Sequence, residues 1–450
     1  MQVTSFGFFW LIVLFLAAQK DQITLLKVVM FSALFQAGAV FIIFGKAISP
    51  FMASCIMFII DYLFRCKFKP KLSIPFFFKI YLYFLFIILC GAIIAAIAFR
   101  GIVYMENKDW ISYARYDGHI AFFGLFTLVI FGLMLLLVYN LKSIPLEEIE
   151  RMIDIMVAFV FIIGLWHFGT VMNYIPRNDF IRDFIYSNST TTENIAYFVD
   201  TNISLRIYQS IFNIRFCGPF MEPSYCAGFL AMAFAFYVGK PELKIKDFLL
   251  MTAVVIMTVL TYSATAYVSL VFAGVASAIS SGKAEHLLKI ISRACVLIMF
   301  ALVLVTKFEL WNVIQRLIIN KLDSHSAYIR GLWNTNAIKT FFDTKGFGMG
   351  YANVRGSSLF YTIPASCGIM GTLFLIIFII AFIQRCGKTG YGKKQQLRFQ
   401  TMFLATLFAM VVAISVLDYS IFWMSAILLV IHKQVYADKN HTCNELIATI

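Results

Sequence analysis

Residues 215–230, RFCGPFMEPSYCAGFL, place charged groups directly before an apolar run. Two prolines disfavour a helix before Pro223, which itself suits the first turn of the helix that follows. A helix start carries unpaired N–H groups and partial positive charge, and Arg215 adds a full charge. These features predict a site for an anion such as a diphosphate, with Glu222 as a fixed carboxylate beside it. In the alternative interpretation, Glu222 caps the helix and Arg215 neutralises it or extends to the interface.

A second charged stretch, residues 321–350, predicts a helix from about residue 324 to 342. Asp323 or Ser324 is a natural N-cap. Ser326 and Arg330 are four residues apart and therefore share a helix face. The planar guanidinium of Arg330 matches phosphate oxygens, whereas the alternative role is a salt bridge to Asp323.

Three further features of this stretch have both a chemical and a structural interpretation. His325 lies about 140° around the helix from Arg330, so both can serve one ligand only across the helix start. Its neutral imidazole can accept a proton, although a lone loop histidine is often only a surface residue. Trp333 either anchors the helix at the interface or stacks on a sugar ring. Residues 346–350, GFGMG, follow no strand and predict a tight turn returning the chain to the membrane rather than a dinucleotide loop.

The elements that position these residues must be membrane helices. The chain has 450 residues, of which 61% are hydrophobic and only 13% charged, with a mean hydropathy of +0.85. Apolar runs of about 15 to 24 residues recur along it, about what a helix needs to cross a bilayer. We therefore predict an all-α polytopic integral membrane protein with about 12–13 transmembrane helices. The net charge of +14 is explained by basic loops that flank spans, so no nucleic-acid partner is expected.

The apolar runs predict thirteen spans, near residues 6–18, 23–45, 50–64, 75–98, 119–139, 152–172, 224–239, 247–262, 265–280, 288–306, 361–383, 399–417 and 419–435. The first is read as a helix and not as a cleaved signal. Residues 65–71 hold four basic and no acidic residues, and residues 385–398 hold five and none, so both loops are predicted to be cytoplasmic.

This topology divides the chain into five parts. N-terminal transmembrane helices (1–172) precede a first large outer loop (173–223), and central transmembrane helices (224–306) precede a second one (307–360). C-terminal transmembrane helices and a cytoplasmic tail follow (361–450). Most ionisable residues within the spans, Asp418 among them, lie near span ends, which argues against a proton-coupled transporter.

The nine cysteines are scattered without a C-x-x-C pattern, so no metal site is expected. Cys217 and Cys226 flank the motif at residues 215–230. They could pair in an oxidising compartment, although buried thiols are the simpler interpretation.

Both loops together resemble the bacterial O-antigen polymerase (Wzy) family and, more distantly, the O-antigen ligases. Similar residues are the run at 218–224 that opens a span, the Leu-Thr-Tyr-Ser turn at 260–263, and the set Ser326, Arg330, Trp333, Gly346, Gly348 and Gly350. The resemblance implies a GT-C-like fold with two large periplasmic loops in the bacterial inner membrane. It also implies an inverting, metal-independent glycosyltransferase without a cofactor, whose donor and acceptor are undecaprenyl-diphosphate-linked oligosaccharides.

By this resemblance, Arg215 and Arg330 grip diphosphate, and Glu222 or His325 deprotonates or orients the acceptor. Ser326 and Trp333 would help to bind substrate, and a chain-length regulator protein is a candidate partner. The chain departs from the family pattern at Ala264, where many relatives carry a basic residue. O-antigen ligase and lipid-linked oligosaccharide flippase or other transporter remain alternative functions, and a structural assembly protein is a third.

Overall fold

The computed structural model describes residues 2–43, 46–70, 72–105, 113–141, 144–171, 174–176, 184–185, 187, 215–240, 242–281, 325–386 and 393–431. The helices in this part of the chain are α1 (Ser5–Lys20), α2 (Gln22–Ser32), α3 (Pro50–Arg65), α4 (Phe76–Ala98), α5 (Gly118–Tyr139), α6 (Leu146–Val171), α9 (Pro223–Val238), α10 (Ile245–Leu260), α11 (Ala264–Ser281), α14 (His325–Asp343), α15 (Leu359–Cys386), α16 (Lys393–Ala413) and a last helix, Ser420–Ile431. Five short strands are β1 (Gln2–Val3), β2 (Phe41–Ile43), β3 (Lys46–Ile48), β4 (Val103–Met105) and β5 (Tyr113–Arg115).

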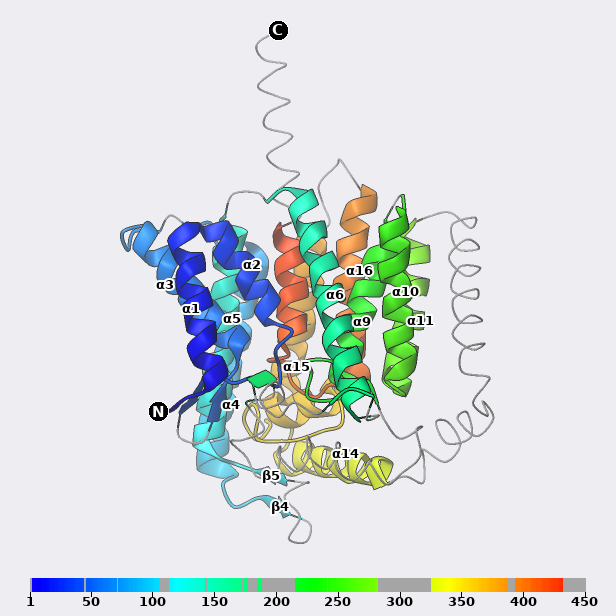
Figure 1. Cartoon of the computed structure of the whole chain (residues 1–450). Helices are drawn as coiled ribbons and strands as arrows, with labels where there is room; N and C mark the ends of the chain where they lie inside the picture. The colour runs from blue at the N-terminus through cyan, green and yellow to red at the C-terminus, as the bar shows by residue number, and fades with distance from the viewer. Residues whose placement is uncertain are drawn as a thin grey trace.

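Most of these helices stand side by side in one bundle, with α14 lying across one end of it (Figure 1). Within the described residues, five helices are long and apolar enough to cross a membrane, and five shorter helices are also apolar. With 23 residues, α4 extends roughly 34 Å, more than the hydrocarbon core of about 30 Å. The chain is therefore a helical, multi-pass membrane protein. Twelve of the thirteen predicted spans coincide with a helix, at least in part, and the thirteenth, 288–306, lies outside the described residues.

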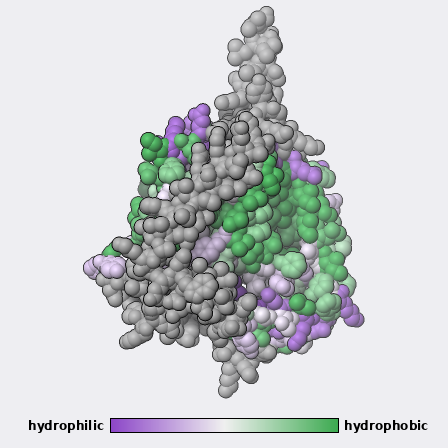
Figure 2. Space-filling view, turned by 90° about the vertical axis from the view of Figure 1, so that its right-hand side faces the viewer, coloured by the Kyte–Doolittle hydropathy of each residue, from purple (hydrophilic) through white to green (hydrophobic). Residues whose placement is uncertain are grey.

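The centre of the bundle is formed by α9 and the last helix. Every residue of α9 except Tyr225 is buried, and every residue of the last helix is buried. A helix that is apolar on all sides needs such a position. On the outside, α4 exposes Phe86 and Ile97. Hydrophobic side chains gather over the helical part of the face in Figure 2, with hydrophilic ones towards its upper and lower edges, as expected of a surface that contacts lipid.

The single span predicted at residues 23–45 is wrong. After Ser32 the helix α2 ends in a tight turn, and the chain then enters strand β2, which pairs with β1 and β3. Side chains of the last helix secure this turn, because the Ser420 hydroxyl donates to the carbonyl of Ala33 (2.8 Å) and accepts from Gln36 (3.0 Å). The apolar run at residues 23–45 thus contains a helix that is only roughly 16 Å long, about half the thickness of the hydrocarbon core of a bilayer.

Basic loops gather on one face of the bundle, the upper one in Figure 1. There the buried Lys240 ammonium pairs with Asp247 (2.6 Å) and Glu150 (3.4 Å), and Arg398 pairs with the same glutamate (2.8 Å). These pairs connect the loop before α10 and the start of α16 to α6. On the same face, Arg65 donates to the carbonyl of Ala18. The assignment of residues 65–71 and 385–398 to the cytoplasm stays a prediction.

The opposite face carries a small folded layer beneath the bundle. It consists of α14, the β4–β5 hairpin and residues 349–358, joined by a bridge between Ala114 and Val354. Ala337 of α14 and Met349 complete a small core with them. This layer holds the second group of predicted site residues against the helix ends.

The predicted turn at residues 346–350 is confirmed, and α15 explains it. Gly368 (φ 69°) kinks α15, which frees backbone groups around the kink. Their partners are turn residues, because the N–H groups of Met349 and Gly350 donate to the carbonyls of residues 365 and 366 (3.0 and 2.9 Å). Gly348, with φ +84°, approaches the kink so closely that a Cβ would lie 2.6 Å from its backbone.

Gly348→Ala should therefore lower the free energy of unfolding by about 1–3 kcal/mol, the usual cost of one strained backbone residue. The thermal midpoint of the detergent-solubilised chain measures this loss. Gly331→Ala is the matched control, because a Cβ there meets nothing within 4 Å and alanine favours the helix. Equal midpoints for the two variants would contradict the packing of the turn against the kink.

Candidate functional site

The segment before α9 is fixed to the turn between α10 and α11. The N–H of Phe216 donates to the carbonyl of Leu260 (2.8 Å), and Nε of Arg215 donates to that of Thr261 (3.0 Å). The ring of Phe216 lies against Gly164 of α6, where a side chain would not fit. Two short sequence motifs that lie about forty residues apart are thereby brought together.

Glu222 lies at the N-cap of α9, and Pro223 occupies the first turn, as predicted. The Glu222 side chain makes no capping hydrogen bond. The carboxylate instead accepts from the Ser224 hydroxyl (3.0 Å) and remains half-buried. The capping interpretation therefore accounts for the backbone position of Glu222 but not for its charged group.

Arg330 of α14 lies within electrostatic range of Arg215. Burial lowers the pKa of the Arg215 guanidinium; the charge of Arg330 adds to this, whereas Glu222 opposes it. In the part of the chain that the structure describes, neither guanidinium has a carboxylate within ion-pair distance. Two like charges thus lie within electrostatic range of each other, with Glu222 partly offsetting them, and an anion near both would relieve their repulsion. Asp323, the alternative partner of Arg330, lies outside the described residues.

Trp333 contacts a third arginine, which the sequence did not predict. The Arg355 guanidinium lies 4.0 Å from the centre of the Trp333 ring, in cation–π contact. Its loop is held by Asn353, whose side chain accepts from the N–H of Asp117 (3.1 Å), and by Ser357, whose N–H donates to α14. Arg355 follows the glycine-rich turn directly, and this position is the only signal of it in the sequence.

Asp418 is a second residue that sequence reasoning did not assign to the site, and it is acidic. It lies in the break between α16 and the last helix, where its neighbours Leu417 and Tyr419 are buried but its own side chain is exposed. Tyr225, in the first turn of α9, interacts electrostatically with Glu222, Arg355 and Asp418. Both carboxylates and the third arginine therefore lie within electrostatic range of one tyrosine.

His325 and Ser326 belong to α14, but their side chains lie outside the described residues. Their predicted roles as base and substrate contact remain predictions. Cys217 and Cys226 are both buried and form no disulfide, which is the simpler of the two interpretations. Among the described residues, no three His, Cys, Asp or Glu side chains form a group that could hold a metal ion.

The site combines three arginines with two carboxylates at the helix ends, on the face opposite the basic loops. The arginines are Arg215, Arg330 and Arg355, and the carboxylates are Glu222 and Asp418. Guanidinium groups bind phosphate oxygens in a planar, two-point geometry, and a nearby carboxylate can accept a proton from a hydroxyl. The arrangement suits transfer of a group away from a phosphate or diphosphate. Compared with protein-family models, curated proteins and solved structures, the chain matches none.

Proposed function

We propose that this protein is an O-antigen polymerase, an inverting GT-C-like glycosyltransferase that joins undecaprenyl-diphosphate-linked oligosaccharide repeat units into a polysaccharide. The observation that carries the proposal is the pair Arg215 and Arg330, which come from separate loops and lie near each other with no described carboxylate pairing either. Such unneutralised charge favours a multiply charged anion, and the diphosphate of a lipid carrier is one.

In the proposed reaction, the acceptor hydroxyl of a new unit attacks the anomeric carbon that links the growing glycan to its carrier. The carbon–oxygen bond to diphosphate breaks, and undecaprenyl diphosphate leaves with the electron pair. Arg215 and Arg330 stabilise the negative charge that develops on it. The hydroxyl proton passes to Glu222 or His325. The cation–π pair of Trp333 and Arg355 borders the site and offers a platform for a sugar ring.

The proposed orientation follows from charge. The face with residues 65–71, Lys240 and Arg398 is rich in basic loops, and such loops usually remain in the cytoplasm. We assign the opposite face, with α14 and Glu222, to the periplasm of a bacterial inner membrane, where lipid-linked units would meet. A chain-length regulator protein is a candidate partner at this face.

A transporter of lipid-linked oligosaccharides is a weaker candidate. Alternating access requires charged residues inside the bundle, whereas the described charges gather at its two ends. O-antigen ligase is the nearer alternative, because it uses the same donor and differs only in the acceptor, the lipid A core.

Deleting the gene in its native host and separating the lipopolysaccharide on a gel tests the proposal. The expected result is a ladder that collapses to core bearing one repeat unit and that plasmid-borne wild type restores. Complete loss of repeat units from the core would indicate a ligase or a flippase instead. An unchanged ladder would contradict a role in this polysaccharide.

A further inference from the structure

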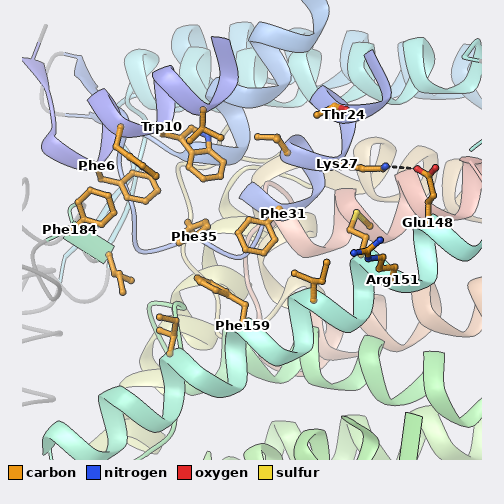
Figure 3. A pocket seen from close by; sticks show the side chains of 17 residues that line it. Phe6, Trp10, Thr24, Lys27, Phe31, Phe35, Glu148, Arg151, Phe159 and Phe184 are labelled. Carbon is orange, nitrogen blue, oxygen red and sulfur yellow. Dashed lines mark ion pairs between the residues drawn. The ribbon is translucent and has the colours of Figure 1, made fainter. Parts of the chain in front are cut away.

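A cavity of about 840 Å³ lies between α1, α2 and α6, and none of the arginine-site residues lines it. Figure 3 shows its lining: aromatic side chains from α1 and α2 face α6, and polar residues occupy one end. We call this cavity the α1–α6 groove. Its lining comprises Phe6, Phe9, Trp10, Val13, Thr24, Lys27, Val28, Phe31, Phe35, Glu148, Arg151, Met152, Ile155, Phe159, Ile163, Phe184 and Ile185.

The walls of the groove are apolar over most of its length. Phe159 of α6 contacts Phe31 of α2 and Phe35 in the turn after α2, with ring centres 5.0 and 5.3 Å apart. From Glu148 to Ile163, α6 rises roughly 22 Å, at 1.5 Å per residue. This exceeds one leaflet, which is half of a core of about 30 Å. The groove is thus long enough and dry enough for one acyl chain.

The end of the groove on the basic-loop face carries its charges. Lys27 and Glu148 form an ion pair, marked by the dashed line in Figure 3. Arg151 lies one turn further along α6, is exposed, and has no ion-pair partner within the described chain. The charged lining residues therefore sum to +1, from two basic residues and one acidic residue.

We infer that the α1–α6 groove binds an anionic phospholipid from the leaflet on the basic-loop face, with its phosphate at Arg151 and one acyl chain along the aromatic wall. The groove meets both requirements of such a lipid. Its apolar part is long enough for an acyl chain, and its charged end carries a net positive charge at the depth of the lipid head groups. A charge of +1 complements a headgroup that carries −1, such as phosphatidylglycerol, better than a zwitterionic one. This inference does not depend on the proposed function.

Native mass spectrometry of the full chain in detergent can compare phosphatidylglycerol with phosphatidylethanolamine of the same acyl chains. We expect wild type to retain phosphatidylglycerol preferentially and Arg151→Gln to bind it about tenfold more weakly, the loss that one charge-assisted contact produces. Ile155→Trp, which fills the cavity, should reduce binding of both lipids. Lys69→Gln is the matched control: it removes one exposed positive charge on the same face, outside the groove, and should bind as wild type does.

Wild-type binding by both Arg151→Gln and Ile155→Trp would overturn the inference, as would equal retention of the two lipids by wild type. Size-exclusion profiles establish that each variant is folded before it is compared. Should Ile155→Trp fail this check, Val28→Trp fills the same cavity from α2 and replaces it.

Discussion

If the proposed function is correct, we expect Arg330→Ala to lower the rate of polymerisation by about 10²- to 10³-fold, the usual cost of removing one preorganised group that stabilises developing charge. Arg215→Ala should have an effect of the same order, because both guanidinium groups act on one leaving diphosphate in the proposed reaction. Neither Arg215 nor Arg330 has an ion-pair partner among the described residues. Replacing either arginine therefore leaves no described carboxylate without an ion-pair partner. Both variants should therefore reach the membrane at the wild-type level.

The measurement is glycan length on a gel in the complemented deletion strain, together with the amount of each variant in the membrane fraction. Arg115→Ala is the matched control, an exposed arginine on the same face that lies beside Asp117. Its ladder should be that of wild type. If the proposed roles are correct, the double variant Arg215→Ala/Arg330→Ala loses little more than either single variant, because groups that act as a unit are not additive. Wild-type chain lengths from either single variant would remove that arginine from the mechanism.

Apolar runs predicted the bundle well, because crossing a bilayer needs a minimum length of apolar helix wherever it stands. The failure at residues 23–45 has a physical cause. The run remains apolar past Ser32, since the turn that follows is itself buried, and hydropathy does not distinguish a buried turn from a buried helix. What ends α2 is a contact with Ser420, almost four hundred residues away along the chain.

The candidate site was predictable only in part, for a related reason. Arg215, Glu222 and Arg330 stand out locally, because prolines or a helix start surround them. Arg355 becomes a candidate only when the small core of residues 349–358 and α14 places it on Trp333. In the sequence, Asp418 stands at the end of an apolar run and resembles a residue whose side chain extends to the interface. In the structure, the break before the last helix brings it within electrostatic range of Tyr225. Such tertiary placement leaves no trace in local spacing.

The acid–base partner of the reaction gives the other large expected effect. Glu222→Gln should slow polymerisation by about 10²- to 10⁴-fold, the range that a general base contributes. The glutamine is of similar size, and its carbonyl oxygen can still accept from the Ser224 hydroxyl, which limits structural change. Glu242→Gln is the control, an exposed glutamate on the basic-loop face, and should retain the wild-type rate.

The pH dependence of the rate with purified lipid-linked units separates the two candidate bases. The two candidates are distinguished by which substitution removes the loss of rate on acidification, because protonation inactivates a base. If Glu222 is the base, Glu222→Gln abolishes the acidic limb and His325→Ala preserves it. An acidic limb that persists in Glu222→Gln and disappears in His325→Ala would assign the proton to the histidine. Asp418→Asn completes the comparison: because Asp418 interacts electrostatically with Tyr225, a loss of rate with an unchanged limb would make it a positioning residue.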